Sequence, residues 1–289
     1  MNSLPVLDIN LERIIDKVLV NKAQKSDRDY THFHPSEFCQ CHRKLVYKYY
    51  EAKGICTASE KNAILFDARL QRIFDNGHSL HARLGGNLAA TGLLKGRWEC
   101  VPCHKKFGFN QKFGVVKPSI CECNSSKFHY IEVGFLDEET MLGGHVDIII
   151  DLSGQEVNGQ LIPKNASVED SHLIVDFKSI RSEMFKTLSS PKDDHFSQMQ
   201  IYLYLSGLKF GKFLYENKND QMFREYLVVR DEVFIDKIVH EAKGLKKIVT
   251  STNSAGKWTL PARAHKKDNV KECIECAFRS HCWGIKKQD

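Results

Sequence analysis

The chain has 289 residues, of which 42% are hydrophobic and 27% are charged. These proportions are those of an ordinary globular protein and exclude extensive disorder. No apolar run approaches the roughly 18–20 residues that span a bilayer, and the opening segment lacks the pattern of a signal peptide. We therefore expect a cytoplasmic protein with no membrane segment. The net charge of +6 permits binding to nucleic acid but does not by itself indicate it.

The first part of the chain is expected to be mainly helical. Apolar residues recur at helical spacing over 11–20, from Pro35 to about residue 54, and over 60–92. The local composition changes from residue 98 to about 129, where four cysteines and several lysines replace long aliphatic side chains. We interpret this stretch as a small inserted module.

The second part is expected to contain the strands. Runs rich in β-branched and aromatic residues, separated by polar breaks, are typical of strands. They span 129–136, 143–152, 172–180, 210–218 and 223–230. Helices are predicted over 193–208 and 231–249, and the tail from residue 250 is expected to be irregular and basic.

The ten cysteines are clustered, and in a cytoplasmic chain this indicates bound metal better than disulfides. Four have the spacing of a zinc ribbon or knuckle, although the second pair is closer than usual: Cys100, Cys103, Cys121 and Cys123. His104 and His129 are substitute ligands. A structural Zn²⁺ would let this short segment fold without a large core. Cys39 and Cys56 remain unassigned.

Basic and aromatic residues lie together in two places and are candidates for contact with nucleic acid. The candidate residues are Arg43, Lys44, Tyr47, Lys105 and Lys106. In the module the alternative is a solvated lysine surface, with the phenylalanines forming a miniature core. Near Arg43 the alternative is an ordinary solvated face.

Two aspartates lie within apolar, strand-like sequence, GGHVDIII for Asp147 and LIVDFKS for Asp176. A buried carboxylate is costly unless it is compensated, and a divalent cation is a common compensation. The two-residue period of a strand places Asp176 and Lys178 on one face and Phe177 on the other. The alternative is an ion pair between Asp176 and Lys178, with Asp147 capping a turn.

This set of groups suits phosphodiester hydrolysis. Two acids and a backbone carbonyl, that of Phe177, could hold Mg²⁺ or Mn²⁺ through oxygen atoms. The metal would activate a water molecule, and Lys178 would orient or deprotonate that water or offset developing charge. Gln198 and Tyr202 are four residues apart and share a helix face.

In sequence order these motifs resemble the RecB-type branch of the PD-(D/E)XK nuclease superfamily, over roughly residues 36–282. The motifs are GxxxH ending at His81, then Glu132, GHVD with Asp147, VDFKS with Asp176 and Lys178, and QxxxY with Gln198 and Tyr202. The resemblance implies an α/β fold, a mixed central sheet flanked by helices as in restriction endonucleases. It also implies that His81, Glu132, Asp147 and Asp176 lie near the metals, that Lys178 is catalytic, and that Gln198 and Tyr202 position the site or the DNA. Two departures are the long loop 153–171 and a looser match at Glu132.

The last cysteines, Cys273-x2-Cys276-x5-Cys282, need a fourth ligand to close a four-thiolate site. The iron–sulfur nucleases of this branch, among them the CRISPR-associated exonucleases and AddB-type helicase–nucleases, place one cysteine before the core and three after it. The resemblance therefore implies a 4Fe-4S cluster held by Cys41 and the three C-terminal cysteines. Cys39 is the rival to Cys41, zinc is the rival to iron, and reduced buried cysteines are the third alternative.

The expected organisation has three parts: a helical region over 1–96 that contributes to the nuclease domain, an inserted zinc ribbon over 97–130, and the nuclease core with its iron–sulfur tail over 131–289. The resemblance implies a metal-dependent exonuclease that acts on single-stranded DNA ends through two Mg²⁺ or Mn²⁺ ions. The alternatives are a structure-specific or nicking endonuclease of the same superfamily and a non-catalytic DNA-binding or adaptor protein. No GxxxxGK[ST] loop is present, so any helicase activity in repair or recombination would need a partner.

Overall fold

The computed structural model describes residues 10–22, 28–57, 68–251 and 259–284. The chain forms two compact units. The first comprises Met1–Asp29, Thr57–Ser79 and His265–Asp289, and the second comprises Tyr30–Cys56 and Leu80–Ala264. Among the described residues, no helix is long and apolar enough to cross a membrane.

The described parts of the first unit are largely helical. The helix predicted over 11–20 is confirmed as α1 (Leu11–Lys22). The helix predicted over 60–92 is observed as α4 (Ala68–Ala90), which contributes residues to both units, and residues 60–67 lie outside the described residues.

The tail was expected to be irregular, but it contains two short helices, α9 (Lys271–Ile274) and α10 (Arg279–Trp283). The imidazole of His281 lies 2.8 Å from the Thr57 carbonyl, so the tail contacts another segment of its own unit.

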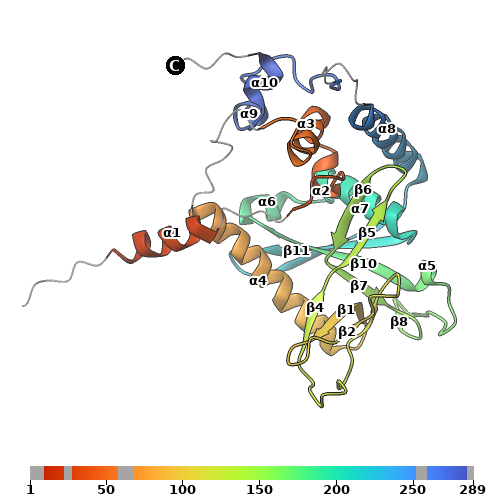
Figure 1. Ribbon diagram of the computed structural model, residues 1–289. Coiled ribbons are helices and arrows are strands. Elements are labelled where there is room, and N and C mark those ends of the chain that lie inside the picture. The colour runs from red at the N-terminus through yellow and green to blue at the C-terminus, as the bar shows by residue number, and fades with distance from the viewer. Residues whose placement is uncertain (1–9, 23–27, 58–67, 252–258, 285–289) are drawn as a thin grey trace, which may run out of the picture. The chain divides into compact units, whose positions relative to one another are not determined.

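The second unit is built on a mixed sheet (Figure 1). In the described part of the chain its strand order is β12-β11-β10-β7-β1-β2, and β3 and β4 also pair with β1. The strands are β1 (Leu94–Cys100), β2 (Lys106–Phe107), β3 (Val115–Val116), β4 (Phe128–Ile131), β7 (Ile148–Asp151), β10 (His172–Ile180), β11 (Phe210–Asn217) and β12 (Phe223–Val229). β10 and β11 run parallel, whereas the other pairs are antiparallel.

Helices cover the two faces of this sheet because alternate strand residues point to opposite sides. Val175 and Phe177 of β10 pack with Leu84 of α4 on one face. Ile174 packs with Leu203 of α7 (Asp193–Ser206) on the other. The predicted α/β class, a mixed central sheet flanked by helices, is confirmed.

A two-stranded hairpin leaves the main sheet between β4 and β7. Its strands are β5 (Val133–Asp137) and β6 (Leu142–Val146), which pair with each other in a separate sheet. One residue, Glu132, separates β4 from β5, and one residue, Asp147, separates β6 from β7. The prediction that Asp147 lies inside a strand is therefore wrong, because the chain passes from one sheet to the other at this residue.

The remaining elements lie around this framework. They are α2 (Pro35–Phe38), α3 (His42–Ala52), β8 (Glu156–Val157), β9 (Gln160–Leu161), α5 (Val168–Ser171), α6 (Ser182–Thr187) and α8 (Glu232–Thr250). The helix expected after Pro35 is broken into α2 and α3. Helix α3 packs against α8, and both α2 and α8 pack against α7.

Candidate active site and thiolate metal centre

The hairpin register brings two acids together. Val133 pairs with Val146 across β5 and β6. The residues one step further out, Glu132 and Asp147, therefore face each other at the base of the hairpin. His81 of α4 joins them, and one ligand atom from each of the three residues lies within 4.8 Å of the others.

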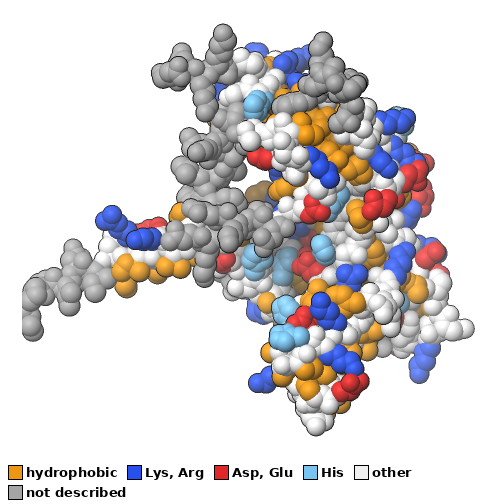
Figure 2. Space-filling view, in the orientation of Figure 1, with side chains coloured by type: hydrophobic (Ala, Val, Ile, Leu, Met, Phe, Trp, Pro, Cys, Tyr) orange, Lys and Arg blue, Asp and Glu red, His pale blue; other side chains and the backbone are white. Residues whose placement is uncertain are grey.

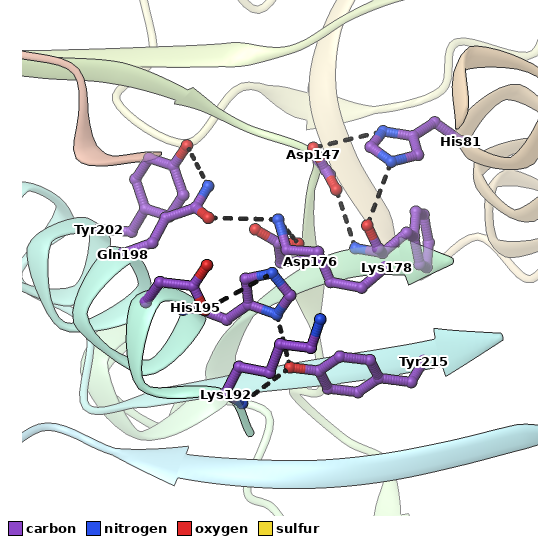
Figure 3. Close-up of polar contacts among 11 residues, drawn as sticks. His81, Asp147, Asp176, Lys178, Lys192, His195, Gln198, Tyr202 and Tyr215 are labelled. Carbon is purple, nitrogen blue, oxygen red and sulfur yellow. Dashed lines mark hydrogen bonds and ion pairs between the residues drawn. The ribbon is translucent and has the colours of Figure 1, made fainter. Parts of the chain in front are cut away.

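Asp147 and His81 are oriented by the backbone of Phe177 (Figure 3). The Phe177 N–H donates to Asp147 Oδ2 at 2.9 Å. The Nε2 of His81 lies 3.2 Å from the Phe177 carbonyl oxygen, which can only accept, so Nε2 carries the proton. His81 Nδ1 lies 3.4 Å from Asp147 Oδ1, so the two groups can share a cation, whether a proton or a metal ion. An N–H bonded to a carbonyl oxygen is the usual state of the second nitrogen of a metal-binding histidine.

Asp176 and Lys178 lie on the other face of β10 from Phe177, as the two-residue period predicts. Asp176 is only 2% exposed, and its Oδ1 lies 2.8 Å from Lys178 Nζ. Lys178 Nζ also donates to Gln198 Oε1 at 3.2 Å, and Gln198 Nε2 donates to the Tyr202 hydroxyl at 3.2 Å. Figure 3 shows this chain of contacts running from β10 to α7.

The acids of the site lie close together and are partly removed from solvent, and their pKa values are raised. Burial raises the pKa of Asp147 to about 7 against the opposing effect of Lys178. Burial likewise raises the pKa of Asp176 to about 6. Glu132 is exposed at the residue level, but desolvation of its carboxyl group and the nearby Asp176 raise its pKa. Burial alone would lower the pKa of Lys178, but Asp176 and Asp147 outweigh it and the pKa is raised. The lysine is therefore a cation at neutral pH, and the acids still favour additional positive charge.

A second polar cluster, not singled out from the sequence, lies beside Lys178. His195 precedes Gln198 by three residues on α7, and its Nδ1 lies 2.7 Å from the Tyr215 hydroxyl. Tyr215 pairs with Lys178 across β10 and β11, and its oxygen accepts from the Lys192 N–H at 3.4 Å. Burial, aided by Lys178, lowers the pKa of His195 to about 4, so its ring is neutral. The helical spacing from Gln198 is the sequence signal that could have found His195.

Four cysteines converge in the inserted module. Cys100 Sγ lies 3.4 Å from Cys123 Sγ, and Cys103 Sγ lies 3.5 Å from Cys121 Sγ. All four sulfur atoms lie within 4.8 Å of one another. A tetrahedron with Zn–S bonds of about 2.3 Å has sulfur separations of about 3.8 Å, so the set can hold a metal ion with little change.

Each cysteine pair lies in a backbone turn that is closed by a hydrogen bond. In the first, the His104 N–H donates to the Cys100 carbonyl at 2.8 Å; in the second, the Asn124 N–H donates to the Cys121 carbonyl at 2.8 Å. His104 and Asn124 both have positive φ, 58° and 62°, in the left-handed region that asparagine and histidine tolerate well. The closer spacing of the second pair is therefore accommodated by a turn that is one residue shorter, and both turns end in a residue with positive φ.

A hydrogen-bond donor next to the exposed thiol of Cys103 favours its ionised form. The backbone N–H of Lys105 lowers the pKa of Cys103 to about 7. A thiolate is the form that binds metal. His104 instead contacts Glu99 at 2.6 Å, and neither His104 nor His129 is part of the four-sulfur group.

The candidate nucleic-acid residues have different surroundings. Lys105 forms an ion pair with Glu122, and Lys106 lies 5.3 Å from the centre of the Phe109 ring. Phe107 packs against the core of the main sheet. Figure 2 shows hydrophobic, basic and acidic side chains interspersed over this module. Phe107 is thus a core residue, although it packs against the core of the main sheet and not in a miniature core of the module. Lys106 is exposed and Lys105 is half-buried.

Near α3 one prediction is wrong. Tyr47 is 2% exposed and lies in the interior, so its ring cannot stack on a base. Arg43 donates from Nη1 to the Pro261 carbonyl at 3.0 Å. Lys44 is half-buried.

The cysteines of the predicted cluster belong to different units. Cys41 precedes α3 in the second unit, whereas Cys273, Cys276 and Cys282 belong to the first. Cys39 is exposed and Cys41 is half-buried. The iron–sulfur cluster, and the choice between Cys39 and Cys41, stay predictions.

No protein-family model and no curated protein matches the chain. Among solved structures, SSO0001 is similar over 96% of this chain and 97% of its own, with 16% identity and a TM-score of 0.43. The alkaline exonuclease LHK-Exo from Laribacter hongkongensis is similar over 41% of this chain and 56% of its own, with 19% identity and a TM-score of 0.31. Its complex with dAMP is similar over 76% and 88%, with 13% identity and a TM-score of 0.38. Likenesses this distant carry no conclusion about the activity of this chain.

Proposed function

We propose that this protein is a metal-dependent DNA nuclease, an exonuclease that acts on single-stranded ends by two-metal phosphodiester hydrolysis. The observation that carries the proposal is the meeting of the His81 ring with the carboxylates of Glu132 and Asp147. This donor set lies beside a buried acid and a cationic lysine, Asp176 and Lys178.

The donors fit a hard divalent cation. Carboxylate oxygens suit Mg²⁺ and Mn²⁺, and His81 adds one nitrogen ligand. His81, Glu132 and Asp147 would hold one ion, and Asp176 is the acid available for a second. A bound ion of this kind polarises a phosphoryl oxygen and makes a coordinated water more acidic.

Lys178 supplies charge and orientation. Its ammonium group is held by Asp176 and Gln198, at 2.8 Å and 3.2 Å. Because its pKa is raised, it acts as a hydrogen-bond donor that orients the attacking water or offsets charge on the phosphate. Tyr202 supports Gln198 in this position.

We assign the inserted module, residues 97–130, to a structural Zn²⁺ held by Cys100, Cys103, Cys121 and Cys123. The core at 131–289 and the helical region at 1–96 complete the enzyme, with Cys41, Cys273, Cys276 and Cys282 binding a 4Fe-4S cluster. Four thiolates are the usual ligands of such a cluster. Iron content and broad absorbance near 400 nm after anaerobic purification test this assignment; a colourless, iron-free protein would contradict it.

The test of activity is an assay with end-labelled single-stranded DNA and Mg²⁺ or Mn²⁺. The wild type should degrade linear strands but leave circular strands intact, and Lys178→Ala should lose cleavage while keeping its fold. Cleavage of circular strands would favour an endonuclease. Absence of cleavage with either metal would favour a DNA-binding or adaptor protein.

A further inference from the structure

Tyr130 of β4 contacts the backbone of the candidate site. Its hydroxyl donates to the Asp147 carbonyl oxygen at 2.9 Å. Asp147 belongs to neither β6 nor β7, so this bond reaches its peptide where the chain crosses between two sheets. A carbonyl oxygen can only accept, so the Tyr130 hydroxyl is the donor in this bond.

The ring of Tyr130 has a fixed place. It packs edge-on against Trp98, with ring centroids 5.2 Å apart. Trp98 is 2% exposed, and its indole N–H donates to the Val115 carbonyl at 3.0 Å. The ring also lies directly over Gly96, where an added Cβ would stand 2.2 Å from Tyr130 Cε2. The glycine therefore leaves the room that the tyrosine ring occupies.

The strand pair that contains Tyr130, β1 with β4, also contains one of the four cysteines. Cys100 pairs with Phe128, Trp98 pairs with Tyr130, and Arg97 pairs with Ile131 across β1 and β4. The next residue of the chain is Glu132, one of the candidate ligands. The strand pair thus connects the sulfur ligands to Glu132 by backbone and to Asp147 by the Tyr130 hydroxyl.

We propose that Tyr130 is a positioning residue that couples the four-cysteine centre to the divalent-metal site by holding the Asp147 peptide. The proposal rests on the proposed nuclease function, because it concerns the metal site of that enzyme. The inserted module is then more than an added surface: its folding sets the geometry of Glu132 and Asp147.

The test is Mn²⁺ affinity, measured by electron paramagnetic resonance on the full chain. Tyr130→Phe keeps the ring and removes only the hydroxyl. It should bind Mn²⁺ about tenfold more weakly, the usual effect of removing an outer contact to a metal ligand. The matched control is Tyr204→Phe, since the Tyr204 hydroxyl donates to Asp137 Oδ2 at 2.6 Å outside the site. Cleavage by Tyr130→Phe should fall at limiting Mn²⁺ and recover at saturating Mn²⁺.

The coupling has a separate readout. Cys103→Ser with Cys123→Ser should weaken Mn²⁺ binding by a smaller factor in the Tyr130→Phe background than in the wild-type background, because changes along one coupled route are not additive. Unchanged Mn²⁺ affinity in Tyr130→Phe, or equal losses in Tyr130→Phe and Tyr204→Phe, would overturn the inference. If the wild type and Asp147→Asn bind Mn²⁺ alike, the proposed function itself fails instead.

Discussion

The two groups of candidate metal ligands are assembled by different means. The four cysteines come from two short turns within residues 100–123, each closed by its own backbone hydrogen bonds. The carboxylate site draws His81 from a helix, Glu132 and Asp147 from a hairpin base, and Asp176 from a central strand. The first group is local in sequence, whereas the second exists only when the sheet is complete.

Because of this difference, we expect the four-cysteine site to contribute mainly to stability and the carboxylate site mainly to catalysis. A site made of local turns can fold around its ion and contribute directly to stability. A site of crowded acids destabilises the protein until a cation compensates it. Loss of the metal ion held by the four cysteines should therefore mainly lower the free energy of unfolding, whereas loss of the acids should mainly lower the rate of cleavage.

The largest expected effect is on cleavage. Asp147→Asn keeps an acceptor for the Phe177 N–H but removes the charge facing His81. Since a metal ion supplies several kcal/mol of charge stabilisation, cleavage should fall about a thousandfold or more. Single-turnover cleavage of labelled DNA measures this.

The control for that variant is Glu169→Gln, which changes an exposed acid paired with Lys209. It should cleave like the wild type. An Asp147→Asn enzyme with undiminished activity would remove this carboxylate from the site.

The next effect is on stability. Cys100→Ser removes a buried thiolate ligand, so bound zinc should be lost and the unfolding free energy should fall by several kcal/mol. The thermal midpoint should drop by roughly 10 °C. Zinc content and thermal unfolding measure the two changes. Cys56→Ser is the matched control, because Cys56 is also buried but lies outside the four-sulfur group; equal zinc content in both variants would contradict the assignment.

A smaller effect is the pH dependence of stability without divalent metal. The pKa values of Asp147 and Asp176 are raised to about 7 and about 6, so the folded state binds more protons than the unfolded state in this range. The contribution of these two acids to the free energy of unfolding should be greatest below about pH 4, and it should be lost as the pH rises toward 7. Mn²⁺ at a hundred times the dissociation constant measured at pH 8 should add about 2.7 kcal/mol at pH 8. The same Mn²⁺ concentration should add less at pH 5, where protons compete for the acids. Thermal unfolding across this pH range, with and without Mn²⁺, gives the answer; a Mn²⁺ effect that is larger at low pH would contradict it.

The smallest expected effect concerns the module surface. Reversing the charges of Lys105 and Lys106 to Glu should weaken DNA binding several-fold and reduce its salt dependence, since counterion release scales with phosphate contacts. Lys209→Glu with Lys212→Glu makes the same charge change elsewhere. Equal losses in the two double variants, measured by fluorescence anisotropy at several salt concentrations, would show a general charge effect.

Local geometry was predictable from the sequence. The period of a strand placed Asp176 and Lys178 together, the helical spacing joined Gln198 to Tyr202, and the cysteine spacing indicated the four-thiolate group. Each relation spans a few residues or a known motif, so it needs no tertiary information.

The remaining features depend on register and burial. Glu132 meets Asp147 only because Val133 pairs with Val146, and the hairpin register was not predicted. Tyr47 has an aromatic ring suited to stacking, but its helix face turns inward, and a lone sequence does not reveal this. Tyr130 carries no motif at all, since its role in the fold arises from an opposite tryptophan and a glycine on β1.

The most direct test of the central claim is the anomalous diffraction signal of Mn²⁺ in crystals of the full chain. We expect a Mn²⁺ ion bound by His81, Glu132 and Asp147 in the wild type and no ion there in crystals of Asp147→Asn. Wild-type crystals with no Mn²⁺ at these three residues would contradict the claim that they form the active-site metal centre.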